Sequence, residues 1–166
     1  MTPALPLTAG AFAPYGAVLS ADRDDVSARG ANQGTAARRD FIAELVNLRP
    51  HARLNLASFR CAPRDLSRFR VALLERHPHS SQVFVPMNAS RYLVVVALGG
   101  ERPDPSTLRV FKALGTQGIS YAPGVWHHPM IALDAPTDFT CLVWEDGSAE
   151  DCVEHPLEAP FALSVG

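Results

Sequence analysis

Proline and glycine interrupt this chain so often that long helices have little room to form. Fourteen prolines and eleven glycines are spread over 166 residues, and the runs between them are short and rich in Val, Leu, Phe and Tyr. This spacing is typical of many strands joined by turns. We expect strands in the runs 54–61, 68–75, 82–87, 92–98, 119–122, 129–133 and 139–144.

Two short helical segments are predicted between these strands. Thr8 is a helix-capping residue ahead of an Ala-Gly-Ala-Phe turn. Asp104 and Pro105 suit the first positions of a second helix over 105–114, with Gly115 at its C-terminal end. The chain is therefore predicted to be mainly β, an antiparallel barrel or sandwich with one or two short helices, in a single domain over residues 1–166.

Composition argues against several classes of partner. Charged residues make up 19% of the chain, their signs are mixed, and the net charge is −2, so a nucleic-acid partner is not expected. The longest apolar stretch, 92–98, is about a third of a membrane span. Three widely spaced cysteines, Cys61, Cys141 and Cys152, and a start with no secretion signal predict reduced thiols in the cytoplasm.

The first of two histidine groups reads Glu-Arg-His-Pro-His-Ser-Ser-Gln over residues 75–82. In an extended chain Glu75, His77 and His79 point to the same side. Either that face turns outward or it lines a polar cavity.

The second histidine group follows a turn at Pro123 and Gly124. The turn places His127 at the start of a new strand. In an alternating strand only one of His127 and His128 faces inward.

Both groups resemble the two metal-site motifs of the cupin superfamily. The first motif pairs His-x-His with a carboxylate, whose place Gln82 takes here, and the second sets a histidine after a Pro-x-Gly turn, here shortened to adjacent Pro123 and Gly124. The resemblance implies a cupin-like antiparallel β-barrel of jelly-roll type. It also implies that the two groups converge on one pocket, with His127 facing inward.

Such a group of side chains suits either of two chemistries. His77, His79, Gln82 and His127 are candidate ligands of a divalent metal ion such as Ni, Mn, Fe or Zn. Without a metal, the same histidines suit direct acid–base catalysis near neutral pH.

Most of the chain resembles the ureidoglycolate lyase family. The matching stretches are 12–16, 32–38, 74–86, 91–96, 117–121, 124–129 and 137–139. The resemblance implies an enzyme of the allantoin branch of purine breakdown, often a homodimer, that splits (S)-ureidoglycolate into glyoxylate and urea. The apolar run 92–98 is a candidate for the dimer interface. Family members often carry Asp-Arg-Gly-Gly where this chain has Val-Trp-Glu-Asp-Gly at 143–147, so the arginine of that stretch is missing.

In this reaction a hydroxyl proton is removed and the departing nitrogen is protonated. We expect His77 and His127 to polarise or deprotonate the hydroxyl, Gln82 to orient the substrate and Glu75 to exchange a proton. The alternatives are a related cupin enzyme acting on another small ureido or hydroxy acid, and a non-catalytic cupin that binds a small molecule.

The substrate carboxylate needs its own partner. A guanidinium matches a carboxylate in geometry, and Arg38 and Arg60 are the candidates. The remaining predicted substrate contacts are a polar loop that closes over the site and an aromatic wall. They are Asn32 and Thr35 in the loop, and Tyr92, Tyr121 and Trp126 in the wall.

Overall fold

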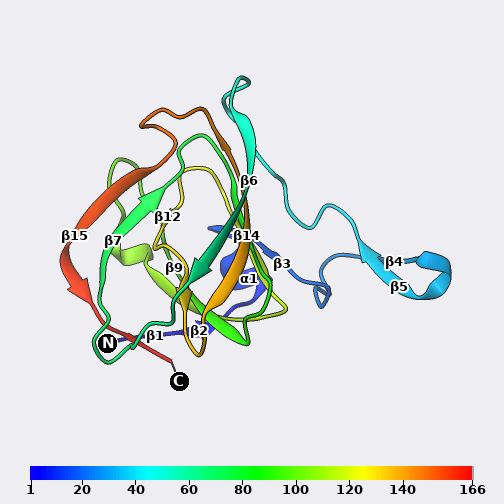
Figure 1. The fold of residues 1–166 in the computed structure, drawn as a ribbon, viewed down its shortest axis with the longest axis horizontal. Coiled ribbons are helices and arrows are strands. Elements are labelled where there is room, and N and C mark those ends of the chain that lie inside the picture. Colours follow the sequence, from blue (N-terminus) through cyan, green and yellow to red (C-terminus); the bar gives the residue numbers. More distant parts are fainter. Residues whose placement is uncertain (166) are drawn as a thin grey trace.

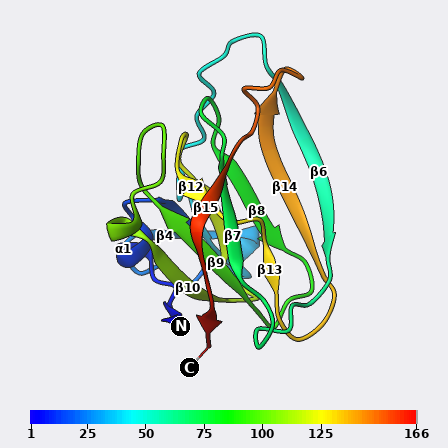
Figure 2. The same cartoon turned by 90° about the vertical axis from the view of Figure 1, so that its left-hand side faces the viewer.

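The computed structural model describes residues 1–165, and Gly166, the last residue of the predicted domain, lies outside the described residues. Within 1–165 the strands form a seven-stranded sheet and a five-stranded sheet that face each other, with two small two-stranded sheets beside them (Figures 1 and 2). The larger sheet has the order β15 (Val153–Phe161), β7 (Val71–Arg76), β12 (Trp126–His127), β9 (Arg91–Ala97), β10 (Arg109–Leu114) and β2 (Leu5–Pro6), with β13 (Ile131–Ala132) also paired to β9. The smaller sheet has the order β3 (Gly16–Leu19), β11 (Gly118–Tyr121), β8 (Gln82–Pro86), β14 (Thr137–Glu145) and β6 (Arg53–Cys61).

The main core fills the space between the two sheets. On β14 the residues Thr137, Phe139, Cys141 and Val143 are buried and alternate with partly exposed ones, as a strand with one covered face requires. Phe139 packs edge-on against Phe84 of β8. The side chains that reach the site therefore come from the inner faces of both sheets.

Strand β9 is buried on both of its faces. Tyr92, Val94 and Val96 belong to the core between the sheets, whereas Leu93 and Val95 belong to a second cluster on the other face. A central strand covered on both sides reads as a continuous apolar run. The run 92–98 is therefore core, and it is not available for a dimer interface.

The predicted mainly β, antiparallel class is confirmed. Most ladders are antiparallel, with parallel pairs where β10 meets β2 and where β1 (Thr2–Pro3) meets β16 (Leu163–Ser164). Across residues 1–165 no ladder joins the two large sheets, so they form an open pair of layers in place of a closed barrel.

The helix predicted after Thr8 is confirmed. Helix α1 (Ala9–Phe12) begins where the Thr8 hydroxyl accepts a hydrogen bond from the Ala11 amide at 3.2 Å, and Phe12 is fully buried. No helix in the described part of the chain is long and apolar enough to cross a membrane.

The helix predicted over 105–114 is wrong. The Asp104 side chain does cap the turn that Pro105 begins, but that turn is only the 3-10 helix η2 (Pro105–Thr107), and the chain then extends as β10. β10 pairs with the buried strand β9 along its whole length, and this pairing outweighs a local helix signal. Gly115 is needed for close packing, because a Cβ there would lie 1.7 Å from the Ala89 carbonyl oxygen.

The predicted polar loop with Asn32 and Thr35 is the tip of a small hairpin. Strand β4 (Ala28–Ala31), the 3-10 turn η1 (Asn32–Gly34) and strand β5 (Ala36–Arg39) form what we call the arm, residues 28–39. The arm projects away from the two sheets on the side of β6 and β14, remote from β7 and β15 (Figure 1).

Candidate active site

Glu75, His77 and His127 meet between the two sheets. Their ligand atoms all lie within 4.8 Å of one another. Glu75 is on β7 directly opposite His127 on β12, and His77 follows the end of β7. Both histidines are buried, whereas the Glu75 side chain is 16% exposed.

His77 and His127 both turn their Nε2 atoms toward the centre of the cluster. Nδ1 of His77 lies 2.7 Å from the Asp151 carbonyl oxygen, and Nδ1 of His127 lies 2.9 Å from that of Val125. A carbonyl only accepts, so Nδ1 carries a proton in each ring and Nε2 is the nitrogen that is left to face the cluster. Within the described residues neither Nε2 has a hydrogen-bond partner. The cluster therefore presents the Nε2 atoms of two imidazoles beside a carboxylate.

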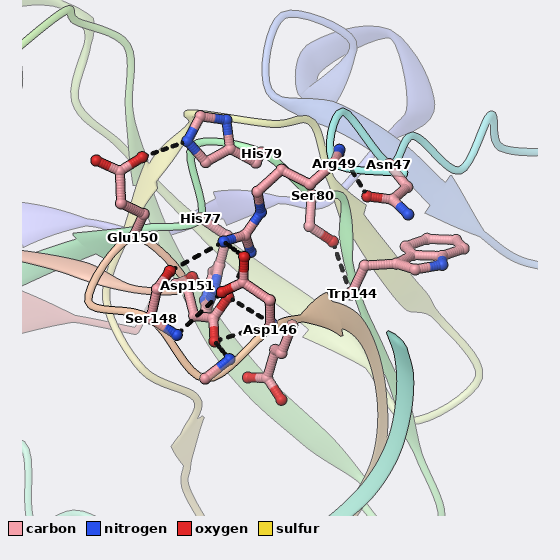
Figure 3. Close-up of polar contacts among 12 residues, drawn as sticks. Asn47, Arg49, His77, His79, Ser80, Trp144, Asp146, Ser148, Glu150 and Asp151 are labelled. Atoms are coloured by element: carbon pink, nitrogen blue, oxygen red, sulfur yellow. Dashed lines mark hydrogen bonds and ion pairs between the residues drawn. The ribbon is translucent and has the colours of Figure 1, made fainter. Parts of the chain in front are cut away.

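An ion-pair network fixes the loop that supplies the Asp151 carbonyl (Figure 3). The guanidinium of Arg49 pairs with the carboxylates of Asp146, at 2.8 Å, and Asp151. The Asp151 carboxylate also accepts hydrogen bonds from the amides of Asp146 and Gly147. Partial burial opposes the charge of Asp151, but these contacts lower its pKa. Arg49 thus brings a guanidinium to this loop from a distant part of the chain.

The turn of the second motif is joined to the first motif. Gly124 has φ of 78°, a left-handed conformation that glycine adopts without strain. Its amide donates to the His77 carbonyl at 2.9 Å. The two motifs are thus held together by a backbone hydrogen bond as well as by their side chains.

Aromatic stacking fixes the plane of His127. The Tyr121 ring lies 4.0 Å from it, centroid to centroid, with 12° between the planes. The His77 ring, from the first motif, lies 5.5 Å from the His127 ring, centroid to centroid, with 20° between the planes. Burial raises the pKa of Tyr121 well above its usual value, so the phenol stays protonated beside the imidazole.

The charges of the cluster depend on its burial. Burial raises the pKa of Glu75, but contacts with His127, whose Nε2 is 3.5 Å away, and His77 outweigh it and give a net lowering. Burial, together with the neighbouring His127, lowers the pKa of His77. Cys152 lies 3.8 Å from the second Glu75 oxygen, and partial burial with that carboxylate raises the pKa of Cys152 to about 12. At neutral pH the cluster thus has an ionised Glu75, a neutral His77 and a protonated thiol.

A cavity of about 290 Å³ borders the cluster at Glu75 and is also lined by Gln82, whereas His77 and His127 lie behind Glu75 and do not line it. Gln82 is buried, and its Oε1 has no hydrogen-bond partner among residues 1–165. The exposed end of the cavity carries the side chains of Arg60 and Arg64. The cavity is lined by Phe59, Arg60, Cys61, Ala62, Arg64, Glu75, Gln82, Phe84, Pro129 and Met130.

Three other predicted residues lie outside this cavity. His79 bonds Glu150 at 2.7 Å, because β7 ends at Arg76 and the alternation that would bring His79 to the metal site stops there (Figure 3). Trp126 lies on the opposite face of β12 from His127, under the Arg76 guanidinium at 4.8 Å. Tyr92 is fully buried in the core and donates to the Gln117 carbonyl.

The predicted polar loop residues are also remote from the cavity. Asn32, Thr35 and Arg38 belong to the arm, which projects from the sheets (Figure 1). Thr35 bonds the Asn32 carbonyl at 2.8 Å, and Arg38 pairs with Asp40 at 2.6 Å. Within one chain, these residues do not close over the cluster.

The structure brings three residues to the site that the sequence did not single out: Asp151, Cys152 and Arg64. Asp151 acts through its backbone, for which no sequence signal exists. The other two are separated from the histidine motifs along the chain, and only the pairing of β15 with β7 and the course of the loop after β6 bring them close.

We expect the free energy of unfolding to fall as the pH drops below about 6.5. Burial is the main cause that lowers the pKa of both His77 and His128 below the ordinary 6.5. The unfolded chain then takes up protons that the folded chain does not bind, at up to about 1.4 kcal/mol per pH unit for each proton. Denaturant titrations between about pH 7.5 and about pH 5 measure this. The His77→Asn variant should show a shallower dependence, and an equal slope in both proteins would contradict the assignment.

Known proteins resemble this chain over nearly its whole length. The family model described as ureidoglycolate lyase matches residues 1–164. A ureidoglycolate lyase of Burkholderia cepacia is 44% identical over 161 residues, which is 95% of this chain and 86% of that protein. One from Pseudomonas syringae pv. tomato is 36% identical over 153 residues, 92% of this chain and 88% of that protein.

A solved structure, a dTDP sugar isomerase from Desulfovibrio desulfuricans, aligns over 88% of both chains at 17% identity with a TM-score of 0.47, too low to support a functional inference. The family model and the sequence relatives agree over nearly the whole chain. This chain belongs to the ureidoglycolate lyase family.

Proposed function

We propose that this chain is a ureidoglycolate lyase that splits (S)-ureidoglycolate into glyoxylate and urea, in the allantoin branch of purine breakdown. The observation that carries the proposal is the pair of buried imidazole Nε2 atoms, without hydrogen-bond partners among the described residues, beside the Glu75 carboxylate, which itself lines a small cavity. Family membership supports the same activity. The whole chain would act as one domain, because residues from β7 through to the loop before β15 build the site.

In the proposed reaction the substrate hydroxyl loses its proton to the pair formed by Glu75 and His127. The electrons of that O–H bond form the C=O of glyoxylate as the C–N bond breaks. The proton is returned to the departing nitrogen, so urea leaves neutral and no net proton is consumed. Gln82 lines the cavity and has an unpartnered oxygen, so it would accept a hydrogen bond from the ureido N–H and orient the substrate.

The same donors fit a divalent metal ion. Glu75, His77 and His127 would hold it, and Gln82 Oε1 is a further oxygen donor. The carbonyl contacts at both Nδ1 atoms orient metal-binding histidines in the usual way. When bound, the ion would supply Lewis-acid polarisation of a substrate oxygen. Ni, Mn, Fe and Zn all suit nitrogen and carboxylate ligands.

We also propose that two chains form a homodimer through the outer face of the five-stranded sheet. Leu54 and Leu56 on β6 lie opposite Trp144 and Leu142 on β14, and Leu54, Leu56 and the nearby Met87 are 51%, 69% and 66% exposed. A contiguous apolar face of this kind marks a protein interface. The arm projects on this side of the molecule, where it would pack against a second copy (Figure 1).

We further propose a reducing, cytoplasmic location, which the free Cys61, Cys141 and Cys152 support.

Purified protein should release glyoxylate from (S)-ureidoglycolate faster than the spontaneous reaction. In the His127→Ala and His77→Ala variants kcat/KM should fall by about 10²–10⁴-fold, because acid–base or metal assistance is lost. Coupled reduction of glyoxylate measures the rate, and circular dichroism checks that the variants fold. His79→Ala is the control, since His79 pairs with Glu150 outside the cluster. Release no faster than the background, with binding retained, would favour the non-catalytic cupin.

Elemental analysis should find about one divalent ion per chain in protein purified without chelator. Removing the ion with a chelator should lower the melting temperature, because ligand binding stabilises the folded state. Glu75→Gln and His77→Ala should both reduce the metal content. Full activity with no metal would overturn this part of the proposal and leave direct acid–base catalysis.

Light scattering should give the mass of a dimer for the native protein. Leu56→Glu places a charge in the proposed interface and should shift the mass to that of one chain. Leu114→Glu is the matched control, because Leu114 is 55% exposed on β10 of the other sheet. A dimer that persists in Leu56→Glu and dissociates in Leu114→Glu would place the interface elsewhere.

A further inference from the structure

The substrate of the proposed reaction carries a carboxylate, and two arginines lie at the exposed end of the cavity. Both Arg60 and Arg64 line it, together with Glu75 and Gln82 at the buried end. A carboxylate is bound best by a guanidinium whose N–H groups are not already used. The partners of the two arginines therefore decide between them.

The guanidinium of Arg60 is already occupied. Its Nε and Nη2 donate to the two carboxylate oxygens of Asp138 at 2.7 and 2.8 Å. Arg60 and Asp138 lie directly opposite each other on β6 and β14, so the pair is built into the sheet. In this two-point pair the Asp138 carboxylate balances the charge of Arg60 and occupies the two N–H groups that would otherwise bind a substrate carboxylate.

The guanidinium of Arg64 has no such partner. No carboxylate within residues 1–165 forms an ion pair or a hydrogen bond with it. The residue is nevertheless held in place. Its amide donates to the Ala132 carbonyl at 2.9 Å, and its guanidinium carbon lies 5.6 Å from the centre of the Phe69 ring. An uncompensated cation is thus fixed at the entrance of the cavity.

We propose that Arg64 binds the substrate carboxylate and sets the preference of this site for anionic substrates, an inference that rests on the proposed lyase function. The position of Arg64 gives the substrate one orientation. Arg64 attracts the carboxylate to the exposed end of the cavity, away from Glu75 and Gln82 at the buried end. The carbon that carries the hydroxyl and the ureido nitrogen then faces Glu75 and Gln82.

The experiment compares Arg64→Met, Arg64→Lys and the control Arg68→Met. Arg68 is on the same loop, its side chain is 91% exposed, and it does not line the cavity. In Arg64→Met the KM for ureidoglycolate should rise roughly 10- to 100-fold with kcat little changed, because a charge-assisted contact is lost in both ground and transition states. Arg64→Lys should recover part of the loss, and Arg68→Met should match the native protein.

Two readouts separate this role from a structural one and from the lyase activity itself. The native protein should prefer ureidoglycolate to its neutral carboxamide, and Arg64→Met should lose that preference. Calorimetry should show that glyoxylate binds the native protein and binds Arg64→Met at least about 10-fold more weakly, whether or not turnover occurs. Glyoxylate binding that depends on Arg64 in a protein without lyase activity would overturn the proposed function alone. If Arg64→Met is active and keeps the native KM and the native preference for ureidoglycolate, the role of Arg64 is overturned. The same holds if the rise in KM and the loss of preference appear in Arg60→Met instead.

Discussion

Two backbone carbonyls determine what the histidines of this protein do. The carbonyls of Asp151 and Val125 each accept a hydrogen bond from an Nδ1–H, and this leaves the Nε2 atoms of both rings facing Glu75. The side chains of Asp151 and Val125 are not part of the cluster of Glu75, His77 and His127. The Asp151 carbonyl is in place because Arg49 ties its loop to the segment ahead of β6. Site chemistry thus depends on an ion-pair network that substrate does not touch.

Gln82 keeps the negative charge of the cavity low. Two buried carboxylates a few ångströms apart oppose each other's ionisation, and one of them then takes up a proton. With an amide at position 82, Glu75 is the one acidic side chain lining the cavity within residues 1–165. It ionises with the help of His127 and His77, and the amide keeps hydrogen-bonding capacity without adding charge.

Sequence patterns predicted the parts of this structure that follow from local periodicity. The strands expected over 139–144 and 92–98 and the cap at Thr8 were predicted correctly, because each pattern depends only on its own segment. The helix over 105–114 failed because caps mark only the first turn, and pairing with β9 decided the rest. The convergence of His77, His127 and Glu75 was anticipated from the motif resemblance. The position of Arg64 depends on tertiary structure, and the bonding of Arg60 to Asp138 depends on strand register, neither of which periodicity specifies.

The pairing of the first strand with the last has a consequence for how the described residues fold. β1, at residues 2–3, pairs with β16, at residues 163–164, and the two ends of the chain lie side by side (Figure 1). The Asp151 carbonyl and β15, which borders β7, also come from the final part of the chain. A partly folded chain in which residues 146–161 have not yet docked therefore has both histidines but not the carbonyl that orients His77, and the outer edge of β7 is uncovered. The cluster thus depends on a late-sequence segment packing against β7 before His77 is oriented.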